Sequence, residues 1–600
     1  MNRPMHPALP RPALRRDLRH DLWRGSEPRA RLRSVSHART QTLTLLALTC
    51  VGFALRMALL DAFPLREDEA IYGFWARTAI SDPFFLHIWP DKPPLFIWLL
   101  SGAFTLFGPS AASARLVSIF ASTLTIPLVA WGARRLWQSP TAALLAAMLM
   151  TFNPFAVSFA PTAYTDSVLV LLGTGAVVAA LNRRGFAAGL LLGAACMTKQ
   201  QGLFYAPLVI ALLMGAPMRA MLRHGWSRVA SNRDHRDLCH PVGVSLPTIP
   251  ERPLRGDNPN GSGWAKAGWT LLGAALIILP VLWWDSQRWA VAPSPWALAL
   301  QTYAPLAWLP PSQWLARGEV WSQWLWYLGG SWTVWLMLGA ALTVALGIAG
   351  RRRSASLHLA FLLGWGILFV ALHLISNVQA WDRYLLPLAP WLALVASGPL
   401  AMALSRRLPD WVRGLLFILL MIGMAETVVP GVDAAKGLMP IGGDHGDYAG
   451  LTAAIAWVED NDGPAILYHQ VLGWHFRFYL YDELYDELQP AGENPQRFDL
   501  RWFPSATYLA DNAAKTPYPP KYLIVPEWAT PRDLALHLAM RGLALEPRHQ
   551  VGRFAVMEIL VPPRPLCDWC QSSSLRSHDP FLPLAMPLHT PLLMSVPTTP

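Results

Sequence analysis

Residues 41–72 read QTLTLLALTCVGFALRMALLDAFPLREDEAIY, an apolar run followed directly by acidic side chains. The apolar part, 41–63, is long enough for a helix that crosses a bilayer. It follows the arginine- and proline-rich segment 1–40 and has no small-residue cleavage site, so we expect it to remain as an anchor with a cytoplasmic basic flank. The three carboxylates at 67–69 then stand at the outer mouth of the span. They could be the ordinary polar flank of a membrane span, part of an ion path or part of a catalytic site.

The composition of the chain is that of a polytopic membrane protein. Of its 600 residues, 53% are hydrophobic and 14% are charged, and 29 are Trp, which favours the membrane–water interface. The Lys and Arg residues behind the net charge of +11 gather in a few segments. This distribution indicates how the chain is oriented in the membrane, and not binding to nucleic acid. The C-x-x-C of Cys567 and Cys570 has no second pair that would predict a zinc site.

Apolar runs of spanning length recur up to residue 430, and the hinges between them alternate in character. One set of hinges is basic and the other is aromatic, acidic or proline-rich, so the positive-inside rule places the first in the cytoplasm and the second outside. The apolar segment 93–108 is short, and we expect a juxtamembrane or re-entrant outer helix there. The predicted fold is a polytopic helical domain over 41–430 with about 11–13 transmembrane helices, its N-terminus inside and its C-terminus outside.

The rest of the chain is predicted to lie outside this helical domain. The basic loop 218–266 lacks periodicity and is expected to be disordered on the cytoplasmic side, as is the Pro/Ser/Thr-rich tail 562–600 on the outer side. Strand-like runs occur at 465–469, 477–481, 521–526 and 553–560, and helical stretches at 447–460 and 531–542. Their alternation predicts a small extracytoplasmic α/β domain over 431–561.

Polar clusters interrupt the apolar pattern at five places, all on the outer side of the predicted topology. They are Glu67-Asp68-Glu69, Asp91-Lys92-Pro93-Pro94, Tyr164-Thr165-Asp166, Thr198-Lys199-Gln200 and Trp381-Asp382-Arg383-Tyr384. Each alone is most simply the polar end of a membrane helix. Their convergence on one leaflet favours a functional site, because ionisable groups at membrane depth are costly. The cations could hold a phosphate, and a carboxylate could accept a proton from a hydroxyl group.

The order of the motifs DEAIY, DKPPLFIWL, TAYTDSVLVLL, TK and RYLLPLAP resembles that in the GT-C membrane glycosyltransferases. The similarity spans roughly residues 45–405 and looks closest to the branch of the protein O-mannosyltransferases and the lipid A aminoarabinose transferase. The resemblance implies an inverting glycosyltransferase of the bacterial inner membrane with a polyprenyl-phosphate-linked sugar as donor. Its partners would be the bilayer and a glycan, lipid or protein acceptor, and no nucleic acid.

The resemblance also implies roles for single residues. Asp68 matches the catalytic base of the first outer loop, with Glu69 as its neighbour and substitute, and Asp166 matches a further active-site position. The donor phosphate would be held by Lys92, Lys199, Arg383 and Tyr384. Asp91 is a candidate ligand for a divalent metal, which some relatives use.

Two other classes of function remain open from the sequence. A transporter or flippase would relay ions or substrate along its buried charges, and it predicts paired broken helices at mid-membrane. The second class is a non-catalytic membrane scaffold. It gives no reason for the placement of the cations in the polar clusters. Arg56, near the outer end of the first span, is expected to snorkel to the interface, with contact to a phosphate as the alternative. His469 and His475 are expected to be structural.

Overall fold

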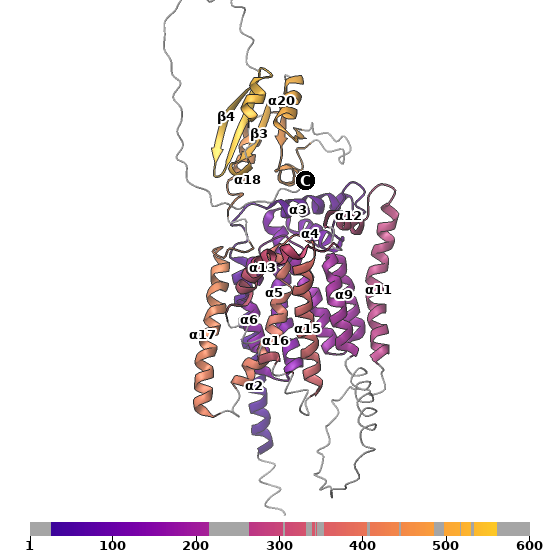
Figure 1. The fold of residues 1–600 in the computed structure, drawn as a ribbon, viewed down its shortest axis with the longest axis vertical. Coiled ribbons are helices and arrows are strands. Elements are labelled where there is room, and N and C mark those ends of the chain that lie inside the picture. Colours follow the sequence, from indigo (N-terminus) through magenta and orange to yellow (C-terminus); the bar gives the residue numbers. More distant parts are fainter. Residues whose placement is uncertain are drawn as a thin grey trace, which may run out of the picture.

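The structure is a computed structural model that describes residues 26–214, 263–303, 307–331, 339–341, 344, 353–404, 409–442, 446–461, 463–484, 497–516, 518–529 and 533–560. It has two parts, a bundle of long helices and a small sheet domain at one end of that bundle (Figure 1). We name the end that carries the sheet domain the outer end. The predictions of disorder for 218–266 and 562–600 fall outside the described residues, apart from 263–266, which begin helix α11.

The bundle consists of apolar helices, as predicted. Among the described residues, five helices are long and apolar enough to cross a membrane, namely Ala38–Met57, Ala111–Trp137, Trp264–Arg288, Leu357–Ile375 and Asp382–Met402. Shorter apolar helices are Leu95–Phe107, Pro140–Thr151, Asp166–Leu181, Gly185–Thr198 and Gln200–Met214. The chain is therefore a polytopic helical membrane protein.

The elements of the bundle follow one another in this order: α2 (Ser26–Met57), α3 (Glu67–Ser81), α4 (Leu95–Phe107), α5 (Ala111–Trp137), α6 (Pro140–Thr151), α7 (Pro154–Ser158), α8 (Asp166–Leu181), α9 (Gly185–Thr198), η2 (Gln200–Phe204), α11 (Gly263–Arg288), α12 (Pro295–Tyr303), η3 (Pro311–Gln313), α13 (Trp314–Gly329), α15 (Arg353–Ile375), η4 (Asp382–Leu385), α16 (Leu388–Ala403) and α17 (Asp410–Ala435). Helices α3, α4 and α12 lie at the outer end (Figure 1). The predicted outer helix at 93–108 is thus α4, packed on α3 and α5.

Small residues allow α9 and α11 to touch backbone to backbone. A Cβ atom added at Gly189 of α9 would lie 2.0 Å from the carbonyl oxygen of Thr270. One added at Gly273 of α11 would lie 2.3 Å from the carbonyl oxygen of Phe186. Since lipid gives little hydrophobic drive for association, such close van der Waals packing is a main source of helix–helix affinity in membranes.

Arg56 of α2 is completely buried, so the prediction that it snorkels to the interface was wrong. Its Nε donates to Ser122 Oγ at 2.8 Å. Its Nη atoms donate to the carbonyl oxygens of Gly52, Met150 and Thr151 at 2.9, 2.9 and 3.1 Å. Helix α6 ends at Thr151, and the last carbonyls of a helix lack intrahelical donors. The guanidinium supplies those donors inside the bundle.

The outer domain is a mixed five-stranded sheet of order β2-β1-β3-β5-β4. Strands β1 (Ala465–His469), β2 (Phe498–Trp502) and β3 (Lys521–Pro526) are parallel, and β5 (Phe554–Leu560) runs antiparallel to β3 and to β4 (Ala544–Val551). The remaining elements are α18 (Leu451–Asn461), α19 (Gly473–Tyr479), α20 (Ala506–Lys515), η5 (Glu527–Ala529) and α21 (Leu534–Ala539). Helices α18 and α19 pack on one face of the sheet, and α20 and α21 on the other.

The strand predictions at 465–469, 521–526 and 553–560 are confirmed, but the one at 477–481 was wrong. That segment overlaps helix α19. Phe476 of α19 packs into the core beneath the sheet, whereas Phe478 packs against the membrane domain. Burial on two sides removes the period of a one-sided helix, so the aromatic run looks like a strand.

We expect Arg56→Met to destabilise the bundle, because the buried carbonyl groups of Met150 and Thr151 at the end of α6 lose their donor. The loss should be on the order of 3 kcal/mol. The thermal midpoint of the detergent-purified protein measures it, with Arg39→Met on the exposed part of the same helix as the control. Equal midpoints for the two variants would contradict a structural role for Arg56.

Candidate active site

Asp68 and Arg383 form an ion pair at the outer end of the bundle. Asp68 lies in the first turn of α3 and Arg383 in η4, and Asp68 Oδ2 is 2.6 Å from Arg383 Nη1. The guanidinium also lies 4.6 Å from the ring centre of Tyr164. Asp68 keeps 37% of its side chain exposed, against 15% for Arg383. The carboxylate is therefore the accessible partner.

Lys199 and Asp166 form a second pair beside the first. Lys199 Nζ is 2.7 Å from Asp166 Oδ1, and the two side chains are only 6% and 3% exposed. The ring of Tyr384 joins the pairs, since its centre lies 4.5 Å from Lys199 Nζ and 5.9 Å from the guanidinium carbon of Arg383. An aromatic face stabilises cations that are held out of water.

Lys92 and Asp91 make a third pair, completed by a residue from α12. Lys92 Nζ donates to Asp91 Oδ2 at 2.6 Å and to the hydroxyl of Tyr303 at 2.7 Å. The same hydroxyl donates to Asp91 Oδ2 at 2.6 Å. Gln200 Nε2 donates to the main-chain oxygen of Asp91 at 2.8 Å, which ties this loop to the residue next to Lys199.

The five predicted clusters thus share one region, and within it each cation of the three pairs has a carboxylate partner. The buried Nε of Arg383 and the hydroxyl of Tyr205 have no hydrogen-bond partner among the described residues. Buried polar groups are usually satisfied. Both groups can donate hydrogen bonds to acceptor atoms of a bound molecule.

Glu69 has a different environment from its neighbour Asp68. It is fully buried, and its two oxygens accept from Arg115 Nε and Nη2, both at 3.0 Å. They also accept from the main-chain N–H groups of Arg66 at 3.0 Å and Ala163 at 2.8 Å. Burial alone would raise the pKa of Glu69, but the charges and hydrogen bonds of Arg115 and Arg66 together outweigh it and hold that pKa below its ordinary value. Glu69 stays ionised and enclosed.

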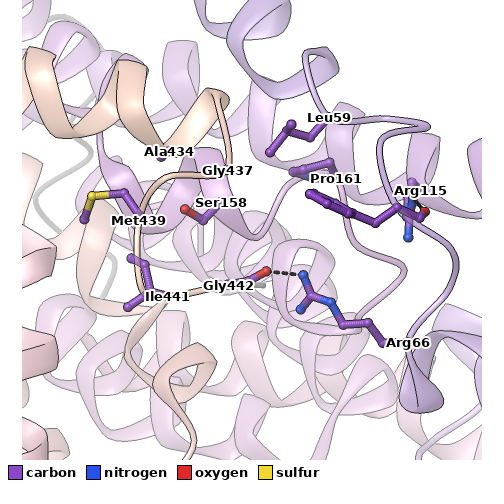
Figure 2. Close-up of a pocket in the computed structure, with 11 residues that line it drawn as sticks. Leu59, Arg66, Arg115, Ser158, Pro161, Ala434, Gly437, Met439, Ile441 and Gly442 are labelled. Carbon is purple, nitrogen blue, oxygen red and sulfur yellow. Dashed lines mark hydrogen bonds between the residues drawn. The ribbon is translucent and has the colours of Figure 1, made fainter. Parts of the chain in front are cut away.

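Arg115 also organises the loop that precedes α3. It donates to the carbonyl oxygens of Leu60 and Phe63 from Nη1, at 2.8 and 2.9 Å, and to that of Pro64 from Nη2 at 3.0 Å. A pocket beside this loop is lined by Arg66, Arg115 and mostly apolar residues, and Arg66 crosses it to donate to the carbonyl of Gly442 (Figure 2). The loop is therefore anchored to the bundle through its main chain.

The residues around Asp91 do not fit a resident divalent metal. Asp91 Oδ2 is shared by an ammonium and a phenol, both of which are donors rather than further ligands. In the part of the chain that the structure describes, no group of three His, Cys, Asp or Glu side chains is placed to hold a metal ion. A protein site for Mg²⁺ or Ca²⁺ needs several oxygen ligands.

Sequence reasoning missed Arg115 and Tyr303. A signal for Arg115 existed, because it is an arginine within an apolar run of spanning length, where charges usually have a role. Tyr303 had no such signal. It lies in a hinge rich in Trp and Pro, and only the fold brings it to Lys92.

Comparisons with known proteins agree with this architecture. Residues 91–231 match the family model of dolichyl-phosphate-mannose-protein mannosyltransferases. The undecaprenyl phosphate-alpha-4-amino-4-deoxy-L-arabinose arabinosyl transferase of Enterobacter sp. (strain 638) is 30% identical over 144 residues, which are 22% of this chain and 26% of that enzyme. The matched segment therefore spans about a quarter of the length of this curated relative.

Solved structures extend the likeness to most of the molecule. ArnT from Cupriavidus metallidurans bound to undecaprenyl phosphate superposes with a TM-score of 0.54 and 16% identity, over 87% of this chain and 98% of that one. The apo state of the same protein gives 0.55 and 17%, with the same coverage. The chain has the GT-C fold. The likeness in fold covers much more of the chain than the match to the family model does.

We expect Glu69→Gln to destabilise the protein by about 3–5 kcal/mol, because it leaves the Arg115 cation buried without a counter-charge. Glu67→Gln is the matched control, since Glu67 is the exposed carboxylate two residues away. Thermal midpoints in detergent measure both. A Glu69→Gln protein as stable as the control would contradict the structural role of this pair.

Proposed function

We propose that the protein is an inverting glycosyltransferase that moves a sugar from a polyprenyl-phosphate carrier to an acceptor hydroxyl. The observation that carries the proposal is the accessible carboxylate of Asp68, paired with Arg383 within a cluster of cations in a GT-C fold. The family match supports it, because residues 91–231 include Lys92, Asp166 and Lys199. The site is proposed to face the outer side of the bacterial inner membrane, with the N-terminus in the cytoplasm and the sheet domain outside.

The cations would bind the donor phosphate. Lys92 and Lys199 are each held near a carboxylate and mostly buried, so these two ammonium groups need little reorganisation when an anion arrives. Preorganised donors in a site of low dielectric stabilise developing negative charge much better than water does. The ring of Tyr384 would keep Lys199 and Arg383 oriented toward the same phosphate.

Donor binding and proton transfer would be linked through Arg383. Arg383 Nη1 lies 2.6 Å from Asp68 Oδ2. A donor phosphate competes for the same guanidinium, and bidentate Arg–phosphate pairs are among the strong interactions of proteins. When Arg383 turns to the phosphate, Asp68 loses its cation and becomes free to accept a proton.

The transfer then needs no covalent intermediate. The acceptor oxygen forms a bond to the anomeric carbon while the bond between that carbon and the phosphate oxygen breaks. The acceptor proton passes to the Asp68 carboxylate, and the electron pair of the broken bond leaves with the polyprenyl phosphate. Attack from the face opposite the leaving group inverts the anomeric centre. Positioning and charge stabilisation supply most of the rate.

The other two candidate catalytic residues are assigned supporting roles. Asp166 is 3% exposed and held by Lys199, so in this proposal it fixes the direction of that ammonium. Glu69 already accepts hydrogen bonds at both oxygens and is enclosed. Neither can reach an acceptor as readily as Asp68, and the base is therefore assigned to Asp68.

We expect Asp68→Asn to reduce transfer by about 10²- to 10⁴-fold, the usual contribution of a general base. The assay follows release of polyprenyl phosphate from purified protein incubated with labelled polyprenyl-phosphate sugars. Asp61→Asn should transfer like the wild type, because Asp61 is an exposed carboxylate in the loop between α2 and α3. Normal transfer by a folded Asp68→Asn protein would remove Asp68 as the base.

We also expect Lys92→Met to weaken binding of polyprenyl phosphate by about 10- to 100-fold, the effect of one charge-assisted hydrogen bond. Titration of the purified protein with polyprenyl phosphate, followed by tryptophan fluorescence, measures the Kd. Lys436→Met is the control, since Lys436 is an exposed lysine at the end of α17. Unchanged affinity for the Lys92 variant would place the phosphate elsewhere.

A further inference from the structure

The outer domain docks onto the helix that carries Asp68. Its helix α19 packs along α3, with the ring of Phe478 so close to Gly73 that an added Cβ would lie 2.7 Å from it. Arg77 of α3 donates from Nη1 to the carbonyl of Phe478 at 2.9 Å, and its Nη2 is 2.6 Å from Asp482 Oδ2. Trp474 of α19 adds aromatic contacts to α3. These contacts cover residues 73–77 of α3, a little over one turn, and attach the outer domain to this helix.

Two side chains of α19 hold the peptide groups of one loop residue. Leu65 is fully buried just before α3. Its N–H donates to the Tyr479 hydroxyl at 3.0 Å, and its carbonyl oxygen lies 3.0 Å from His475 Nε2. His475 and Tyr479 are four residues apart and therefore share one face of α19. A buried N–H or carbonyl without a partner costs free energy, so this pair fixes the main chain at Leu65.

His475 is built to act as a donor only. A carbonyl oxygen can only accept, so Nε2 must carry the proton, and Nδ1 has no hydrogen-bond partner among the described residues. The ring lies 4.6 Å from that of Tyr448 in a stacked arrangement. Burial lowers the pKa of His475 to about 4, so the imidazole stays neutral near pH 7. These features suit a fixed hydrogen bond and not a proton shuttle.

The anchors at Leu65 complete the fixation of the loop ahead of Asp68. Arg115 holds the carbonyls that precede Leu65, and Glu69 accepts from the N–H of Arg66. Both of these side chains belong to the membrane domain. The anchors on Leu65 itself come from the outer domain, only three residues before Asp68 in the chain.

We infer that His475 and Tyr479 are positioning residues for sugar transfer, through which the outer domain sets the place of Asp68 relative to the donor. The inference rests on the proposed function, in which Asp68 is the base. It gives the outer domain a part in the reaction itself. Misplacing a catalytic group by about 1 Å costs about 100-fold in rate, so loss of these anchors should act on kcat.

The test compares variants that differ in a single hydrogen bond. His475→Leu removes the donor to Leu65, and His475→Gln keeps an amide N–H that can replace it. Tyr479→Phe removes the hydroxyl and keeps the ring. Tyr508→Phe is the matched control, because Tyr508 is 49% exposed on α20 of the same domain. If His475→Leu does not fold, Tyr479→Phe alone carries the test.

Two readouts separate positioning from simple stability. Hydrogen exchange of peptides covering 60–72 should become faster in His475→Leu and Tyr479→Phe and stay as in the wild type in the other two variants. The kcat for transfer should fall by about 10- to 100-fold in the first two variants, with the KM for the donor unchanged because the cations remain in place. His475→Gln should restore most of the kcat.

A double variant shows whether the effect passes through Asp68. Adding Tyr479→Phe to Asp68→Asn should cause no further loss, because residues that act as a unit are non-additive. Full additivity would overturn the inference, as would faster exchange at 60–72 with normal kcat. Normal transfer by Asp68→Asn alone would instead remove the proposed base, and the positioning role with it. The exchange experiment, which needs no donor, tells these failures apart.

Discussion

The buried ion pair of Glu69 and Arg115 is the contact on which the outer end of the bundle depends. Such a pair is costly to remove from water, and the cost is offset only when the remaining donors and acceptors are satisfied. Here Glu69 also accepts hydrogen bonds from the main-chain N–H groups of Arg66, just before α3, and of Ala163, before α8. Arg115 donates to carbonyl groups of the loop after α2. One pair thus joins four segments of chain and sets where α3 begins.

That constraint explains why two adjacent carboxylates have different properties. Successive residues of a helix point about 100° apart, so fixing Glu69 inward leaves Asp68 at the edge of the bundle, where Arg383 meets it. Neighbouring carboxylates in unlike environments are a common way for one site to hold a permanent charge beside a group that exchanges protons. Packing, and not residue type, therefore divides the charge cluster in 67–69 into the enclosed Glu69 and the accessible Asp68, the proposed base.

The sequence predicts the parts of this arrangement that follow from local pattern. Apolar runs locate the helices, and polar interruptions locate Asp68, Lys92, Asp166, Lys199 and Arg383, which the fold brings together. The sequence does not predict that Tyr303 joins the pair of Asp91 and Lys92. Its hydrogen bond to Lys92 depends on where the fold places α12. The sequence also places a strand where α19 is helical and misses β2 and β4, since residues buried on two sides, or at a sheet edge, lack the expected period.

The contacts around Asp68 indicate that its main chain is fixed, whereas its partner Arg383 has more freedom to move. The main chain before Asp68 is held by side chains from the bundle and from the outer domain, so the carboxylate has little freedom to follow a departing partner. Arg383 instead has an unsatisfied Nε and a flexible stem, and it lies over the ring of Tyr164, which tolerates sliding. In the proposed reaction, the ion pair therefore breaks by movement of the arginine when a phosphate enters. Asp68, the proposed base, would then remain at the position that these contacts set, as an in-line transfer with little reorganisation requires.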